Sequence, residues 1–75
     1  MFSYTISKTA TKEVFTEVCK TIEKHICCDK EALIEDVDGT LIQIYGTVNG
    51  KIKVYNDYEV NAVYIDSEMN LDDLF

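Results

Sequence analysis

Two turn dipeptides, Asp38-Gly39 and Asn49-Gly50, interrupt a stretch of this chain in which apolar and polar residues alternate. Asp-Gly and Asn-Gly are the strongest short signals for a β-hairpin, because a two-residue type I′ turn requires positive φ at both central positions. Residues 33–55, which surround the turns, are rich in Ile, Val, Thr and Tyr, the residues that favour strands. The sequence therefore predicts three antiparallel strands joined by two tight turns.

The register of these turns decides which apolar side chains share a face of the sheet. Loops of two residues divide them into two sets, one with Leu33, Val37, Ile42 and Ile44 and the other with Leu41, Tyr45, Ile52 and Val54. A one-residue β-bulge would reverse the facing of the residues that follow it. Since glycine within a strand often marks such a bulge, we expect one near Gly46, which brings Ile52 and Val54 onto the first face.

Three further segments complete the predicted fold. Residues 2–6 alternate apolar and polar side chains, the pattern of a strand with one buried face. Residues 58–65 alternate again and predict a fifth strand after a turn at Asn56-Asp57. A helix that Thr9 or Thr11 can cap is predicted between the first two strands. Its apolar stripe consists of Val14, Phe15, Val18, Cys19, Ile22 and Ile26.

The predicted fold class is α+β, in the order β-α-β-β-β-β. One N-terminal amphipathic helix packs on a four- to five-stranded, mainly antiparallel sheet, because each amphipathic element must bury its apolar side. A chain of 75 residues suffices for one small core of this kind. No Pro-rich or low-complexity segment divides it, so residues 1–75 are expected to form a single domain.

Acidic residues are concentrated in the second part of this acidic protein. Residues 1–30 carry five Lys and four acidic residues, whereas residues 31–75 carry two Lys and ten acidic residues, for a formal net charge of −7. The sequence contains no Arg, the residue best suited to bidentate phosphate contact. We therefore expect no nucleic-acid binding and a protein partner with a basic surface.

The cysteines and the hydropathy pattern indicate the compartment. Cys19, Cys27 and Cys28 form no Cys-x-x-Cys pair, and Cys19 lies on the helical stripe, where a free thiol behaves as a small hydrophobe. His25, Cys27 and Cys28 lie together near the end of the predicted helix and, with Cys19, could supply zinc ligands. Adjacent cysteines suit a tetrahedral site poorly, so we expect reduced thiols, no metal and no cofactor. The chain shows neither a signal-peptide pattern nor the ~20 apolar residues of a membrane span. The expected localisation is cytoplasmic, without membrane association.

One six-residue motif suggests an alternative function. The stretch Asp36-Val37-Asp38-Gly39-Thr40-Leu41, preceded by apolar residues, resembles the first motif of haloacid-dehalogenase-type phosphatases. The resemblance implies Asp36 as nucleophile, Asp38 as acid/base and Mg²⁺ bound by both. A minimal Mg²⁺-dependent phosphatase is therefore one alternative. Too few residues follow Leu41 for the doubly wound sheet of that family, so we expect the motif to serve as a turn and the protein not to be an enzyme.

Tyrosines and carboxylates alternate in the last third of the chain. Tyrosine supplies rigid contact area at low entropic cost, and carboxylates attract a basic surface. We therefore expect a protein-interaction domain without catalytic activity, of the accessory, phage or mobile-element type, including inhibitors that mimic nucleic acid. A self-associating structural domain is the other alternative, and the expected state is a monomer or a homodimer. The predicted partner-binding residues are Tyr55, Asp57, Tyr58, Glu59, Tyr64, Asp66 and Glu68.

Overall fold

Five strands and one helix follow one another along residues 1–75, all of which the computed structural model describes. The elements are β1 (Phe2–Ser7), α1 (Lys12–His25), β2 (Asp29–Glu35), β3 (Leu41–Thr47), β4 (Gly50–Asp57) and β5 (Ala62–Ser67). The predicted α+β class and element order are confirmed. The helix follows β1, so it is not the first element of the chain.

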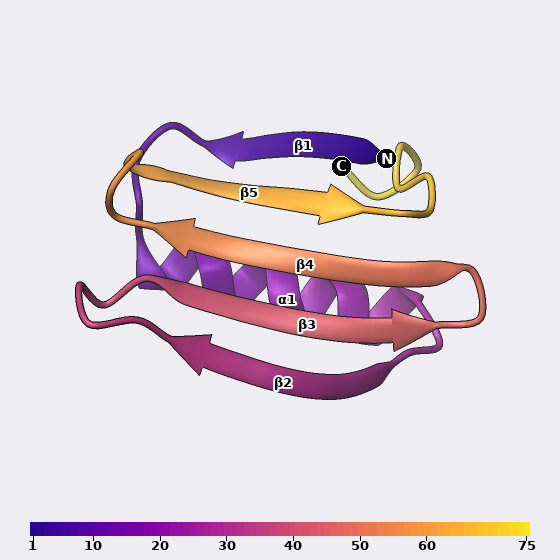
Figure 1. The fold of residues 1–75 in the computed structure, drawn as a ribbon. Coiled ribbons are helices and arrows are strands. Elements are labelled where there is room, and N and C mark those ends of the chain that lie inside the picture. Colours follow the sequence, from indigo (N-terminus) through magenta and orange to yellow (C-terminus); the bar gives the residue numbers. More distant parts are fainter.

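The strands form one antiparallel sheet in the order β1-β5-β4-β3-β2 (Figure 1). Hairpins join the neighbouring strands from β2 to β5, whereas β1 pairs with β5 at the far edge. The helix α1 connects the two edge strands and crosses behind β4 and β3, on one face of the sheet (Figure 1). The opposite face is covered by no helix.

Helix α1 begins after Thr11, whose hydroxyl accepts a hydrogen bond from the backbone N–H of Val14 at 3.2 Å. This contact satisfies one of the N–H groups that a first helical turn leaves free. The buried part of the predicted apolar stripe consists of Phe15, Val18, Cys19 and Ile22. The molecule has no helix that is both long enough and apolar enough to cross a membrane.

The core lies between α1 and the central strands. Alternate residues of β3, β4 and β5 point toward the helix and are buried: Tyr45, Ile52, Val54, Val63 and Ile65. Leu71 of the C-terminal segment joins this core. The hydroxyl of Tyr4 holds the segment in place, because it accepts the N–H of Leu71 at 2.8 Å and donates to the carboxylate of Asp72 at 2.8 Å.

The β3–β4 hairpin contains no bulge, which corrects the expectation for Gly46. The two strands pair without interruption along their whole length. Ile42 and Ile44 therefore lie on the face opposite to Ile52 and Val54, as regular alternation requires. Among the apolar residues of β3 and β4, only those of the second set, Leu41, Tyr45, Ile52 and Val54, point toward α1.

Gly46 has a different role. The side chain of Glu31 crosses it to form an ion pair with Lys51, and a Cβ at Gly46 would overlap the Glu31 carboxylate. The register shift in this part of the sheet lies in β2, between Lys30 and Ala32. The glycine therefore makes room for a crossing side chain, and the bulge lies in the neighbouring strand.

The turn at Asp38-Gly39 is longer than predicted. The N–H of Gly39 donates to the carbonyl of Asp36 at 3.0 Å, and the N–H of Asp36 donates to the carbonyl of Thr40 at 2.9 Å. Only Gly39 has positive φ here, at 89°, so the turn is not type I′. A tight turn followed by a left-handed glycine is the usual three-residue hairpin. Its loop consists of Val37, Asp38 and Gly39.

The extra loop residue also corrects the predicted facing of β2. Leu33 pairs with Gln43, whose buried side chain points toward the helix side, so Leu33 does not share a face with Ile42. Ile34 pairs with Ile42 instead. A shift of one residue in register exchanges the two faces of a strand.

The second hairpin turns one residue earlier than predicted, at Val48 and Asn49, because Thr47 pairs with Gly50. Gly50 has a φ of 119°. The hydroxyl of Thr47 donates to the carbonyl of Gly50 at 2.8 Å and accepts the N–H of Asn49 at 3.0 Å. This displacement leaves the facing of β4 unchanged relative to β3.

Candidate functional site

The sheet face opposite α1 carries most of the predicted binding residues, and we call it the open face. Its side chains alternate along each strand with those that point toward the helix. They are Ser3, Thr5, Glu31, Ala32, Ile34, Ile42, Ile44, Lys51, Lys53, Tyr55, Asp57, Ala62, Tyr64 and Asp66. The open face therefore combines aliphatic, aromatic and charged side chains.

A row of directly paired side chains crosses the open face from β2 to β5, near the end at which β3 begins: Ile34, Ile42, Tyr55 and Tyr64. Paired side chains on one face have Cβ atoms about 4.5–5.5 Å apart, so the row is continuous. Ile34 is exposed and the other three side chains are half-buried. An aliphatic and aromatic strip is thus accessible across four strands.

Tyr55 and Tyr64 stack on each other at the end of this row. Their ring centroids lie 4.5 Å apart and their planes differ by 10°. Partial burial, with the nearby carboxylates, raises the pKa of Tyr55, and burial together with a hydrogen bond to Asp57 raises the pKa of Tyr64 to about 12. Both phenols are therefore neutral at pH 7 and keep their hydroxyl protons.

The carboxylate of Asp57 forms hydrogen bonds within the molecule, mainly to its own loop. It accepts the hydroxyl of Tyr64 at 3.1 Å and the backbone N–H groups of Glu59 and Val60 at 2.9 and 3.3 Å. These contacts fix the reversal that follows β4. Asp57 therefore supports the site more than it offers a free charge to a partner.

The carboxylates of Asp66 and Glu68 each accept only one hydrogen bond within the molecule. Asp66 accepts the hydroxyl of Ser3 at 2.9 Å through Oδ1, and Glu68 accepts the N–H of Lys51 at 2.7 Å through Oε1. Neither Oδ2 of Asp66 nor Oε2 of Glu68 takes part in a hydrogen bond within the molecule. Each residue thus has one carboxylate oxygen available to a partner cation.

The turn predicted at Asn56-Asp57 is wrong, because β4 continues through Asp57 and β5 begins only at Ala62. Tyr58 and Glu59, which were expected to begin the fifth strand, therefore lie in the reversal between β4 and β5. The N–H of Tyr58 donates to the hydroxyl of Thr40 at 3.2 Å, which places this loop beside the β2–β3 loop. These two residues therefore lie at one end of the sheet. Four other predicted residues, Tyr55, Asp57, Tyr64 and Asp66, come together on the open face, with Glu68 at its other end.

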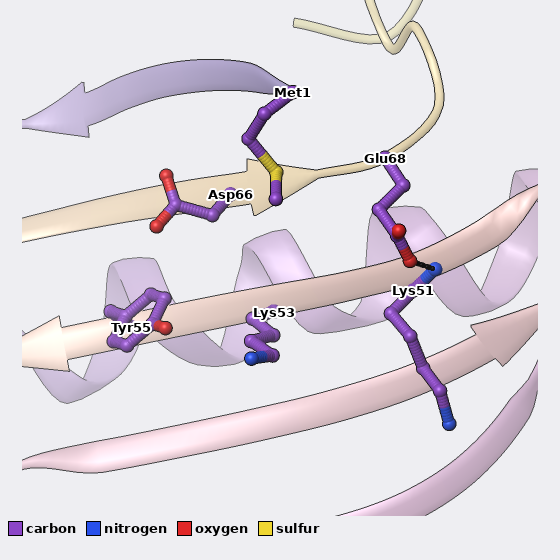
Figure 2. A pocket seen from close by; sticks show the side chains of 6 residues that line it. All are labelled: Met1, Lys51, Lys53, Tyr55, Asp66 and Glu68. Carbon is purple, nitrogen blue, oxygen red and sulfur yellow. Dashed lines mark hydrogen bonds between the residues drawn. The ribbon is translucent and has the colours of Figure 1, made fainter.

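Sequence reasoning missed the lysines of this surface. Figure 2 shows Lys51 and Lys53 on the same side of the sheet as Tyr55 and Asp66, around a shallow hollow of about 240 Å³. Lys51 is paired with Glu31, whereas Lys53 takes part in no ion pair. Their alternation with Ile52 and Val54 was the signal that could have placed them there. The open face is consequently of mixed charge.

The carboxylates of the phosphatase-like motif lie in the exposed β2–β3 loop and bind loop N–H groups. Asp36 accepts the N–H of Val37 at 2.8 Å, and Asp38 accepts the N–H of Thr40 at 2.9 Å. The hydrogen bond from Thr40 lowers the pKa of Asp38. The strand before Asp36 is the edge of an antiparallel sheet. The doubly wound parallel fold that the resemblance implies is therefore not the fold of this chain.

The three cysteines are free thiols in different surroundings. Cys19 is buried in the core, Cys28 is half-buried and Cys27 is exposed. Burial raises the pKa of the Cys19 and Cys28 thiols, which favours their neutral form. No three His, Cys, Asp or Glu side chains converge in a group that could hold a metal ion.

Comparisons with protein-family models, with curated proteins and with solved structures found no match for this chain.

Proposed function

We propose that this domain binds a protein partner with a basic surface through the open face, without catalysing a reaction. The stacked pair of Tyr55 and Tyr64 carries this proposal, because two half-buried aromatic rings lie on a sheet face that no other element covers. Protein interfaces typically have an aromatic or aliphatic centre within a polar rim. The strip that begins at Ile34 supplies such a centre.

The chemistry of the tyrosine end favours a cationic residue of the partner. A Lys or Arg side chain that lies over a tyrosine ring gains cation–π attraction. Asp66 lies two residues after Tyr64 on the same face, opposite Lys53, and its free oxygen can pair with the charge of the partner. Cation–π contacts add about 0.5–1 kcal/mol when exposed and more when desolvated. The lysines of the open face add specificity, because Lys53 requires an acceptor or an open space opposite it.

The net charge of −7 supports the same partner class at longer range. A negative domain is attracted to a basic surface before contact, so the association rate is high and falls with salt. Proteins whose basic surface normally holds nucleic-acid phosphates belong to this class, and the domain would then act as an inhibitor. The exposed thiol of Cys27 is consistent with the reducing cytoplasm, where we expect the domain to act.

The test compares the wild type with two open-face variants, Asp66→Lys and Tyr64→Ala. Asp73→Lys is the matched control, because it makes the same charge change in the C-terminal segment. A partner captured from native cells is purified, and its affinity for each form is measured at low and high salt. Asp66→Lys should weaken binding about tenfold and Asp73→Lys should change it little.

Asp57 is a poor choice for this experiment, because its replacement would also release the loop that it holds. Far-ultraviolet circular dichroism and thermal unfolding must show that the two variants remain folded. If the affinity of the partner depended neither on salt nor on either open-face substitution, binding would have to use another surface.

A further inference from the structure

Strand β2 forms an unprotected edge of the sheet, since all seven of its residues are exposed. The direction of its free hydrogen-bonding groups follows from the hairpin. The N–H of Asp36 donates inward to Thr40, and hydrogen-bonded pairs alternate along an antiparallel ladder. Ile34 therefore bonds inward as well, and the N–H and C=O groups of Leu33 and Glu35 point outward, away from β3. They are available to an added strand.

A groove of about 320 Å³ lies next to this edge, between β2 and α1. It exists because the helix crosses behind β4 and β3 and does not extend over β2 (Figure 1). The Leu33 side chain points into this space and is 59% exposed. The groove has an apolar floor and a lysine rim, with Phe15, Cys19, Leu33 and Leu41 in the floor and Lys12 and Lys20 on the rim.

The rim is cationic although the chain as a whole is acidic. Lys12 takes part in no ion pair, and Lys20 forms one long, exposed ion pair with Glu17 at 4.0 Å. The acidic residue of the groove, Glu23, is already paired with Lys30 at 3.4 Å. The lining of the groove carries three lysines and one glutamate, so its net charge is positive. The groove requires an anionic occupant with an apolar centre.

We propose that β2 accepts an extended acidic segment of a partner protein as a sixth strand, with the pattern Glu-x-Leu-x-Glu. Its backbone pairs with the outward groups of Leu33 and Glu35, and its central Leu packs on the groove floor. This site is separate from the open face and has the opposite charge preference, so it extends the proposed function to a second partner segment.

The spacing of the charges fits this pattern. Lys12 and Lys20 are eight residues apart on α1, which spans about 12 Å at 1.5 Å per residue. Two Glu residues four positions apart on one side of a strand are about 13 Å apart. The helix runs along the direction of the strands in Figure 1, so the two spacings lie in parallel.

The probe is a peptide with blocked termini, Thr-Glu-Thr-Leu-Thr-Glu-Thr, and its counterpart is Thr-Lys-Thr-Leu-Thr-Lys-Thr. Nuclear magnetic resonance of the ¹⁵N-labelled full chain measures affinity and location. The acidic peptide should bind at least tenfold more tightly than the basic one. It should shift the backbone amides of Leu33 and Glu35 and slow their hydrogen exchange, because those N–H groups gain acceptors.

The double variant Lys12→Glu with Lys20→Glu should bind the acidic peptide at least tenfold more weakly than the wild type. Lys8→Glu with Lys24→Glu is the matched control, because it makes the same change of charge at two exposed lysines outside the groove, and it should change the affinity less than twofold. Both forms must give the wild-type amide spectrum away from the substituted residues. Tyr64→Ala on the open face should leave peptide binding intact, which separates this site from the proposed function.

Three results would overturn the proposal. Equal affinity for the two peptides would show that the rim does not select charge. Shifts confined to the open face would move the binding site away from β2. A concentration-dependent dimer by sedimentation, with the amides of Leu33 and Glu35 protected in the absence of peptide, would assign this edge to a second copy of the chain.

Discussion

The hydroxyl of Tyr45, which is fully buried beneath α1, donates a hydrogen bond to the carboxylate of Glu23 on the helix. The contact joins β3 to α1 across the edge of the core. This hydrogen bond is the main reason why the pKa of Glu23 is lowered, and the charge of Lys30 adds to the effect. Burial, together with the same hydrogen bond, raises the pKa of Tyr45, so the phenol remains a donor.

The first prediction concerns stability in acid. The pKa of Glu23 is lower in the folded state than its ordinary value of 4.5, so the unfolded chain binds more protons near that pH. The stabilisation is present above about pH 4.5 and is lost as the pH falls through the depressed folded pKa. The free energy of unfolding, measured with urea between about pH 3 and 7, should fall less toward acid pH in Glu23→Gln than in the wild type. Glu17→Gln is the exposed control on the same helix.

A companion variant tests the donor. Tyr45→Phe removes one hydroxyl from the core and should lower the free energy of unfolding by about 1.5–3 kcal/mol at pH 7, the usual range for a hydrogen bond to a charged group. The acid dependence of this variant should resemble that of Glu23→Gln. A Tyr45→Phe protein with the full wild-type acid loss would show that Lys30 alone depresses the pKa of Glu23.

The second prediction concerns Asn56, which is fully buried on β4 with neither amide atom hydrogen-bonded. An unpartnered buried polar group costs about 1–3 kcal/mol. Asn56→Leu keeps the branched shape and removes the polar atoms, so it should raise the free energy of unfolding by about 1 kcal/mol or more. Asn56→Asp should lower it sharply, because it buries a carboxylate. Denaturant midpoints measure both, and a destabilised Leu variant would show that the amide is satisfied in solution.

The elements of this fold were predictable because each has a local cause. Thr11 can cap a helix wherever it precedes an amphipathic stripe, and alternation marks a strand without reference to its neighbours. The buried positions of α1, Phe15 and Ile22 among them, follow directly from the helical period. The dipeptides Asp38-Gly39 and Asn49-Gly50 likewise located their hairpins within one residue, whereas the turn expected at Asn56-Asp57 lies at residues 58–61.

Register could not be predicted, because it depends on atoms from distant parts of the chain. Asp38-Gly39 is compatible with loops of two or three residues, and the choice exchanges the faces of Leu33 and Ile34. Gly46 carried the signal of a bulge, but it accommodates Glu31, a contact between strands that no local pattern encodes. For the same reason, the sequence did not predict that Ile34, Ile42 and Ile44 share the open face.

The third prediction concerns stability in alkali. The pKa of Tyr64 rises from 10.0 to about 12 in the folded state, so its neutral form is stabilised by folding. That stabilisation is complete below about pH 10 and is lost as the pH rises toward 12, because the unfolded chain releases the proton first. Tyr64→Phe should reduce the loss of unfolding free energy over this range. Ultraviolet difference absorption should also show one fewer late-titrating tyrosine, and an unchanged titration curve would contradict the assignment.

The fourth prediction compares two glycines with positive φ. Gly39→Ala and Gly50→Ala both place a Cβ in a left-handed backbone conformation, which costs about 1–3 kcal/mol. A Cβ at Gly39 would lie 3.4 Å from the ring of Tyr58, an acceptable contact, whereas one at Gly50 would lie 2.6 Å from the Cβ of Glu68. Gly50→Ala should therefore lower the urea midpoint more than Gly39→Ala. If the two variants were equally stable, the loop that carries Glu68 would have to yield at little cost, and the N–H of Lys51 would lose its acceptor.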